Sequence, residues 1–309
     1  MTSSHTAVLG AGTIGASWAA LFLASGRSVA VYDPSPDVER TVRSYVETAW
    51  PTLTALGLTD RGTPEALSFH ATAAEAVEGA GFVQESVPER LPLKHVIFAE
   101  IEPALAPDAV VSSSASGLTL GQMQGGWRDP ARFILGHPFN PPHLVPLVEI
   151  MGNDRTSPGV IEAAEAFYKD VGKTTIRVLR EVQGHVANRL QAAIWREAIH
   201  LVLSGVASVH DVDKAITDGP GLRWAAMGPT TLFHLGAGDQ GLEAYIAHFT
   251  DTYNGWWQEM GQVTMSAEVG RKLAQGLEEV TAGRSVREMA ALRDARLVAI
   301  RQALSGVGL

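Results

Sequence analysis

The chain has 309 residues, of which 46% are hydrophobic and 18% are charged, with a net charge of −9 and no cysteine. This length and composition are typical of a folded protein of two domains and argue against a largely disordered chain. The acidic balance argues against non-specific nucleic-acid binding, which needs a basic surface, and the lack of cysteine excludes disulfides and thiolate chemistry.

The first residues enter a strand-like apolar run at once and show no basic segment of the kind that opens a signal peptide. No apolar stretch approaches the roughly 20 residues that a membrane-spanning helix needs. We therefore expect a cytoplasmic protein that does not contact membranes.

In the first half of the chain, short apolar runs alternate with helical patterns. Strands are expected at residues 7–9, 28–32, 82–83, 109–111, 133–135 and 173–179. This alternation is typical of a Rossmann-like α/β domain with a doubly wound, mainly parallel sheet.

The pattern becomes helical after residue 182 and stays so almost to the end. Apolar residues at helical spacing along the first of these helices are Val186, Leu190, Ile194, Ala198 and Val202. We therefore expect two domains, an α/β domain at residues 1–182 and an all-α domain at residues 183–309.

A glycine-rich G-x-G-x-x-G motif links the first strand to the first helix. Such glycines permit a tight turn and close approach of the backbone to a pyrophosphate at the helix N-terminus. Asp33, at the end of the second strand, would bond the adenosine ribose and repel a 2′-phosphate, which favours NAD over NADP. FAD and a purely structural turn remain alternatives. The candidate contacts in the motif are Gly10, Gly12, Thr13, Ile14 and Gly15.

Residues 132–150 hold a histidine and a glutamate between two apolar runs. If the segment folds back about His143, His137 and Glu149 lie opposite each other, because both are equally far from it along the chain. The carboxylate would then orient an imidazole that moves protons near neutral pH. A core histidine with an unrelated surface glutamate is the alternative.

Four motifs follow one another along the chain. They are Ser113–Leu118 (S-x-x-S-x-L), His137–Pro141 (H-x-F-N-P), Val148–Ile150 (V-E-I) and Gly184–Arg189 (G-x-x-x-N-R). In order and spacing they resemble the L-3-hydroxyacyl-CoA dehydrogenase superfamily over essentially the whole chain. The resemblance implies an NAD-dependent dehydrogenase that dimerises through its helical domain.

The resemblance also implies roles for particular residues. His137 would be the general base that takes the hydroxyl proton, and Glu149 would be its orienting partner. Ser116 and Asn188 would hydrogen-bond the reacting oxygen or the neighbouring part of the substrate. Asn140 would lie beside the nicotinamide and the substrate. A solvent-exposed helical asparagine is the alternative for Asn188.

Glu89 and Lys94 match positions at which members of the superfamily contact the cofactor. For Lys94, a surface lysine without such a role is an equal alternative. Metal chemistry is not expected, because the ten histidines show no clustered ligand spacing.

The region after the second strand bears on the substrate. Acyl-CoA enzymes of this superfamily bind the anionic CoA partly through a lysine-rich helical insertion there. In this chain residues 34–81 contain no lysine, and Arg40, Arg43 and Arg61 lie among acidic residues. This argues for a substrate without CoA.

The helical half contains segments at 219–229 and 233–241 that resemble the free-acid branch of the superfamily, whose members act on L-carnitine or L-gulonate and include lambda-crystallins. Gly-Leu-Arg-Trp at 221–224 and the stretch 283–289 favour the carnitine type. Arg223 would pair with a substrate carboxylate, and Trp224 would offer an aromatic face to a quaternary ammonium group.

Tyr253, Trp256 and Trp257 are further candidates for that aromatic face, although core or dimer packing is the alternative. Pro229 departs from the carnitine-type pattern, which leaves gulonate and acyl-CoA substrates open. The leading expectation is NAD-dependent oxidation of an L-3-hydroxy acid to the 3-keto acid. The competing hypothesis is a non-catalytic, crystallin-like NAD-binding protein.

Overall fold

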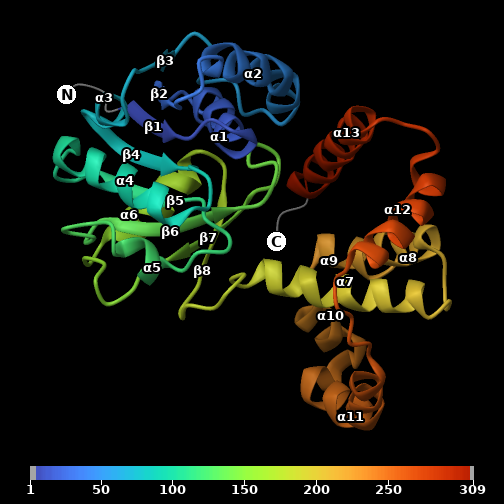
Figure 1. The fold of residues 1–309 in the computed structure, drawn as a ribbon. Coiled ribbons are helices and arrows are strands. Elements are labelled where there is room, and N and C mark those ends of the chain that lie inside the picture. The colour runs from blue at the N-terminus through green and yellow to red at the C-terminus, as the bar shows by residue number, and fades with distance from the viewer. Residues whose placement is uncertain (1–4, 307–309) are drawn as a thin grey trace. The chain divides into compact units, whose positions relative to one another are not determined.

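The computed structural model describes residues 5–306 and contains two compact units (Figure 1). Among the described residues, the first unit runs to Ala187 and also includes Asp294–Gly306, and the second runs from Asn188 to Arg293. The division therefore falls just inside a helix, shortly after the loop in which residues 182–183 mark the predicted domain boundary.

One eight-stranded sheet with the order β3-β2-β1-β4-β5-β6-β7-β8 forms the first unit. Neighbouring strands are parallel except for β6 and β7, which pair antiparallel. The sheet extends in both directions from β1, which makes it doubly wound and Rossmann-like, as the sequence predicts. The strands are β1 (His5–Leu9), β2 (Val29–Tyr32), β3 (Leu67–Phe69), β4 (Ala80–Glu85), β5 (Val110–Ser113), β6 (Phe133–Pro138), β7 (Leu147–Met151) and β8 (Thr174–Arg177).

Helices cover both faces of this sheet (Figure 1). One face carries α1 (Thr13–Ala24), α2 (Val38–Ala55) and α6 (Val160–Asp170). The other carries α3 (Ala73–Val77), α4 (Leu91–Ile101), α5 (Leu120–Gln124) and the short 3-10 turn η1 (Glu102–Ala104).

The two faces explain why the central strands read as unbroken apolar runs. In β1, Val8 enters the core on one face while Ala7 and Leu9 enter the core on the other. Side chains alternate across a strand, so a strand covered on both faces needs apolar residues throughout. The edge strand β3, which the sequence analysis did not predict, buries only Leu67 and exposes Ser68.

The second unit is entirely helical. Its helices are α7 (Ala187–Leu203), α8 (Val209–Asp218), α9 (Pro220–Ala226), α10 (Pro229–Gly236), η2 (Gly238–Gln240), α11 (Gly241–Glu259), α12 (Ala267–Thr281) and the first part of α13 (Val286–Ser305). Among described residues, its buried hydrophobic side chains are few, namely Ala198, Ile199, Val212 and Val269.

The end of α13 belongs to the first unit. Arg301 donates a hydrogen bond to the carbonyl of Leu144 (3.0 Å), and Gln302 donates one to the carbonyl of Ala55 (2.7 Å). None of the described helices combines the length and apolar character that crossing a bilayer requires. Within residues 5–306, no cluster of three metal-binding side chains occurs.

Candidate active site

The glycine-rich loop leaves β1 at Leu9 and enters α1 at Thr13, beside the loop that follows β4. Gly10 has a positive φ of 82°, and a Cβ there would lie 2.7 Å from the backbone of Ser86. A Cβ on Gly15 would lie 1.8 Å from the carbonyl oxygen of Gly10. Both positions therefore need glycine for the fold itself.

Gly12 differs from these two glycines, because a Cβ there would meet nothing within 4 Å. It is the N-cap of α1, whose first turn contains Thr13 and Ile14 and no acidic side chain. A helix N-terminus with open space beside its N-cap residue and no acidic side chain in its first turn is suited to an anion such as a pyrophosphate. The loop therefore fits the expected dinucleotide.

Asp33 follows β2 and holds the glycine-rich loop in place. Its carboxylate accepts hydrogen bonds from the backbone N–H of Ala11 (2.8 Å) and of Ser35 (2.9 Å). A carboxylate has about four acceptor positions, so capacity remains for two ribose hydroxyls. The structure thus puts Asp33 beside the loop, and its contact with ribose stays a prediction.

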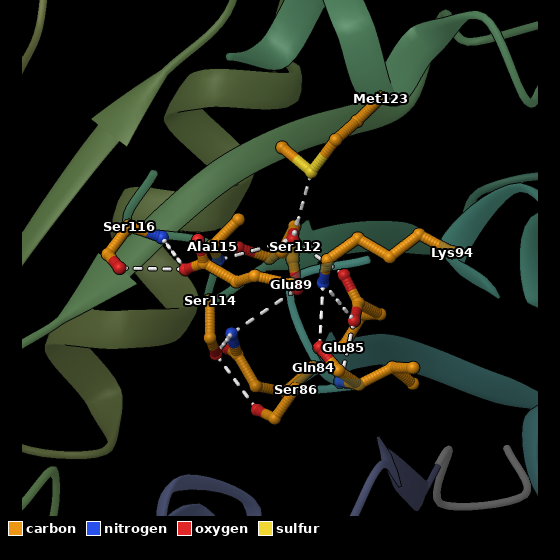
Figure 2. Close-up of polar contacts among 12 residues, drawn as sticks. Gln84, Glu85, Ser86, Glu89, Lys94, Ser112, Ser114, Ala115, Ser116 and Met123 are labelled. Carbon is orange, nitrogen blue, oxygen red and sulfur yellow. Dashed lines mark hydrogen bonds and ion pairs between the residues drawn. The ribbon is translucent and has the colours of Figure 1, made fainter. Parts of the chain in front are cut away.

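Glu89 and Ser116 meet where the loops after β4 and β5 run side by side (Figure 2). The Glu89 carboxylate accepts hydrogen bonds from the Ser116 hydroxyl (2.7 Å) and from the backbone N–H of Gly117 (2.9 Å). Burial raises the pKa of Glu89, but these hydrogen bonds outweigh it and bring the pKa below its ordinary value. Glu89 is therefore an anion that orders the Ser116 loop.

Lys94 is not a surface lysine, and that alternative was wrong. It is only 1% exposed, and its ammonium group donates to the Glu85 carboxylate (2.6 Å) and to the carbonyl of Val87 (2.9 Å; Figure 2). Glu85 also accepts from the Ser113 hydroxyl (2.6 Å). This buried pair fixes the loop that passes Gly10, and a direct contact between Lys94 and the cofactor stays a prediction.

His137 and Glu149 are partners across the antiparallel strands β6 and β7. This is the arrangement expected if the segment folds back about His143. His137 Nδ1 lies 2.7 Å from Glu149 Oε2, and the Glu149 side chain is fully buried. The carboxylate accepts the hydrogen of Nδ1, which leaves Nε2 as the basic nitrogen of the neutral ring.

The second oxygen of Glu149 is also occupied. It accepts hydrogen bonds from the backbone N–H groups of Val186 and Ala187, both at 2.9 Å. Ala187 is the first residue of α7, so the same carboxylate orients the histidine and caps this helix. The next residue of α7 is Asn188, a predicted substrate contact that belongs to the second unit.

The basic side chains of Lys173 and Arg301 hold the loop that joins β6 to β7. Lys173 donates to the carbonyls of Pro142 (2.5 Å) and Val145 (2.6 Å), and Arg301 donates to the carbonyl of Leu144. Burial, followed by the charge of Arg301, lowers the pKa of Lys173 well below its ordinary value. These bonds fix the connection between the strands that carry His137 and Glu149.

The remaining predicted residues are not among the groups that make these contacts. Asn140 is exposed on the loop that follows β6. Arg223 and Trp224 lie on α9 in the second unit, where Arg223 is exposed and Trp224 is partly buried. Their roles, like those of Asn140 and Asn188, stay predictions.

The sequence analysis did not single out His185. Its ring centroid lies 5.2 Å from that of His137, and its Nε2 lies 3.3 Å from the carbonyl oxygen of Ala115, the neighbour of Ser116. It occupies an unassigned position of the Gly184–Arg189 motif, so only its place in that motif could have drawn attention to it.

The environment sets the protonation of His137. Burial is the largest influence and lowers the pKa of the imidazole below its ordinary value, while the hydrogen bond and negative charge of Glu149 partly oppose it. At neutral pH the ring is therefore unprotonated and able to accept a proton.

Comparison with protein families matches residues 5–182 to the NAD binding domain of 3-hydroxyacyl-CoA dehydrogenase and residues 184–280 to its C-terminal domain. Two similar proteins are L-carnitine dehydrogenases. That of Streptomyces coelicolor is 43% identical over 304 residues, which cover 98% of this chain and 96% of that protein. That of Nocardiopsis dassonvillei is 44% identical over 301 residues, with coverage of 97% and 92%.

A similar solved structure is that of 5-formyl-3-hydroxy-2-methylpyridine 4-carboxylic acid 5-dehydrogenase, described as an NAD⁺-dependent dismutase. It is 27% identical to this chain, with a TM-score of 0.83, and the match covers 98% of this chain and 99% of that structure. Both the sheet and the helical part thus have counterparts in one solved structure.

Replacing His137 by Gln should lower kcat by roughly 10²–10⁴-fold, because a neutral amide cannot take the hydroxyl proton. NADH binding, measured by fluorescence titration, should be unchanged, because the glycine-rich loop follows β1 whereas His137 is on β6. His70→Gln, after the edge strand β3, is the matched control and should behave as wild type. Normal turnover by the His137 variant would exclude this histidine as the base.

The acid limb of kcat/KM should lie below about pH 6.5, the ordinary imidazole value. His137 acts only when unprotonated, so its contribution to activity is complete above its lowered pKa and is lost as pH drops through it. Because Glu149 raises that pKa, Glu149→Gln should move the limb to still lower pH. Steady-state rates between pH 4.5 and 9 test this, and a limb above pH 7 would contradict it.

Proposed function

The chain belongs to the 3-hydroxyacyl-CoA dehydrogenase family and is an NAD-dependent dehydrogenase of hydroxy acids, and we propose that its substrate is L-carnitine or a closely similar free L-3-hydroxy acid. The observation that carries this proposal is the 43–44% identity, over nearly the whole chain, to proteins that are named L-carnitine dehydrogenase. The product would be the corresponding 3-keto acid.

Bound NAD would supply the hydride acceptor, held by the glycine-rich loop and Asp33. In the proposed reaction His137 Nε2 takes the proton of the 3-hydroxyl group. Glu149 keeps the other nitrogen protonated and stabilises the imidazolium that forms. Ser116 is proposed to contact the reacting oxygen or the neighbouring part of the substrate, and its loop is ordered by the anionic Glu89.

Electrostatics support a substrate without CoA. All three arginines of residues 34–81 already form ion pairs: Arg40 with Asp37 (2.8 Å), Arg43 with Glu39 (2.8 Å) and Arg61 with Asp170 (3.1 Å). A CoA phosphate would have to compete with these carboxylates, and the region contains no lysine. The pairs are exposed and individually weak, but together they leave no excess positive charge for a polyanion.

The second unit contains aromatic groups suited to a quaternary ammonium ion. Tyr253 lies 5.2 Å from Trp256 and 5.7 Å from Trp257, measured between ring centroids, and both tryptophans are more than half exposed. Exposed indole faces attract cations through the ring quadrupole. Arg223 and Trp224 remain the proposed contacts for the carboxylate and the ammonium group.

We also propose a homodimer that forms through the helical unit. Along α7 part of the expected apolar stripe is exposed, with Leu190 at 62% and Ile194 at 37%, whereas Ala198 is buried. Trp195, next to the stripe, is also exposed (54%). Exposed apolar side chains gathered on one helix are typical of a subunit interface. A cytoplasmic location stays a prediction.

Purified protein with NAD should produce NADH, followed at 340 nm, with L-carnitine and more slowly with L-3-hydroxybutyrate, which lacks the ammonium group. L-Gulonate and L-3-hydroxybutyryl-CoA complete the panel. Turnover of the CoA ester alone would refute the free-acid proposal. Tight NADH binding without turnover of any of these would instead favour a non-catalytic protein.

Light scattering should give twice the monomer mass at micromolar concentration. Leu190→Glu should shift the protein toward monomers, because it introduces a charge into the proposed apolar interface. Val96→Glu on α4 is the matched control, since Val96 is equally exposed (63%) but lies in the first unit. A monomeric wild-type protein would rule out the dimer.

A further inference from the structure

His185 is a buried polar residue with one nitrogen left without a partner. The residue is 2% exposed, and among the described residues nothing hydrogen-bonds its Nδ1. A buried polar atom without a partner is costly, and native proteins satisfy nearly all of them with protein, water or ligand. We therefore expect the hydrogen-bond partner of Nδ1 to be a bound molecule.

The backbone at His185 is also unusual. Its φ is 48°, in the left-handed region, and the only other described non-glycine residue with a positive φ is Ala282. Such a conformation costs energy for a residue with a Cβ and is commonly retained at functional positions. The adjacent N–H groups of Val186 and Ala187 are held by Glu149, which keeps this turn in place.

The neighbours of His185 are the groups expected to surround the reacting carbon. Its ring lies 5.2 Å from that of the proposed base, His137, and Nε2 contacts the carbonyl of Ala115, next to Ser116. All of these residues belong to the first unit. The unpartnered nitrogen is therefore beside the proposed catalytic groups, on a side chain that the proposed chemistry does not use.

We propose that His185 binds the carboxylate of the substrate through Nδ1–H and so selects free hydroxy acids. This inference rests on the proposed function and adds a specificity residue to it. A carbonyl oxygen only accepts hydrogen bonds, so Nε2 carries a hydrogen that it donates to Ala115. A carboxylate also only accepts, so the hydrogen bond that we propose needs a hydrogen on Nδ1 as well.

Charge balance fits this arrangement. The substrate brings one negative charge, and a hydrogen bond to its carboxylate is charge-assisted. Burial first, and His185 to a smaller extent, lower the pKa of His137. The acidic groups of this neighbourhood, Glu149 and Glu89, are each held by backbone N–H groups.

Two substitutions separate the two nitrogens. His185→Asn places an amide close to the position of Nδ1 and suits a left-handed backbone, whereas His185→Gln places its amide close to Nε2 and can keep the bond to Ala115. Each variant is assayed with L-carnitine, L-3-hydroxybutyrate and the methyl ester of L-3-hydroxybutyrate. NADH affinity and thermal stability serve as controls for folding.

His185→Gln should lower kcat/KM for both acids by about 10- to 100-fold, mainly through KM, and should change turnover of the ester by less than about threefold. His185→Asn should retain more acid turnover than His185→Gln. Equal losses for acid and ester, or the reverse order of the two variants, would overturn the inference.

The wild-type result separates this inference from the proposed function. If the wild-type protein oxidises only the CoA ester, both the free-acid proposal and the role of His185 fail. If it oxidises free acids and His185→Gln does so equally well, the proposed function stands and only the role of His185 is refuted.

Discussion

The buried carboxylate of Glu149 is the group on which the candidate site depends. A carboxylate without solvent must be fully hydrogen-bonded, and this one is bonded to His137 by one oxygen and to the N–H groups of Val186 and Ala187 by the other. Orientation of the imidazole and the start of α7 are therefore set by the same group. Any movement of this helix start would leave part of the charge without a partner, so the turn containing His185 and the proposed base are linked energetically.

A second buried carboxylate has the same function on the cofactor side. Glu85, at the end of β4, accepts a hydrogen bond from Lys94 (Figure 2) and others from Ser113 and the backbone N–H of Val87. It thereby fixes the loop that packs against Gly10. Glu89 similarly orders the loop of Ser116. Loops carry the predicted contacts, but buried charges at the ends of parallel strands give those loops a defined shape before any ligand arrives.

The sequence predicts what depends on local pattern. Apolar runs identify the central strands because both faces of the sheet are covered, and Gly10 and Gly15 are required by close backbone contacts. The pairing of His137 with Glu149 follows from the symmetry of their segment about His143. The sequence does not show as well which polar side chains are buried and which groups they bond, because these contacts join segments that are distant in the chain. A lysine is usually a surface residue, and only the folded structure shows that Lys94 is buried in an ion pair with Glu85. The edge strand β3 has too few apolar residues to be recognised from the sequence.

The chemistry and the choice of substrate rest on different physical grounds. Proton transfer needs an oriented imidazole with a lowered pKa, and the first unit supplies it. This step does not depend on whether the substrate is a free acid or a thioester. Discrimination between an acid and a thioester instead needs buried donors that the wrong substrate leaves unsatisfied. The paired arginines after β2 only make CoA less favourable, whereas an unpartnered buried nitrogen at His185 would penalise any substrate that fails to bond it. We therefore expect the residues that select the substrate to lie beside His137 and Glu149.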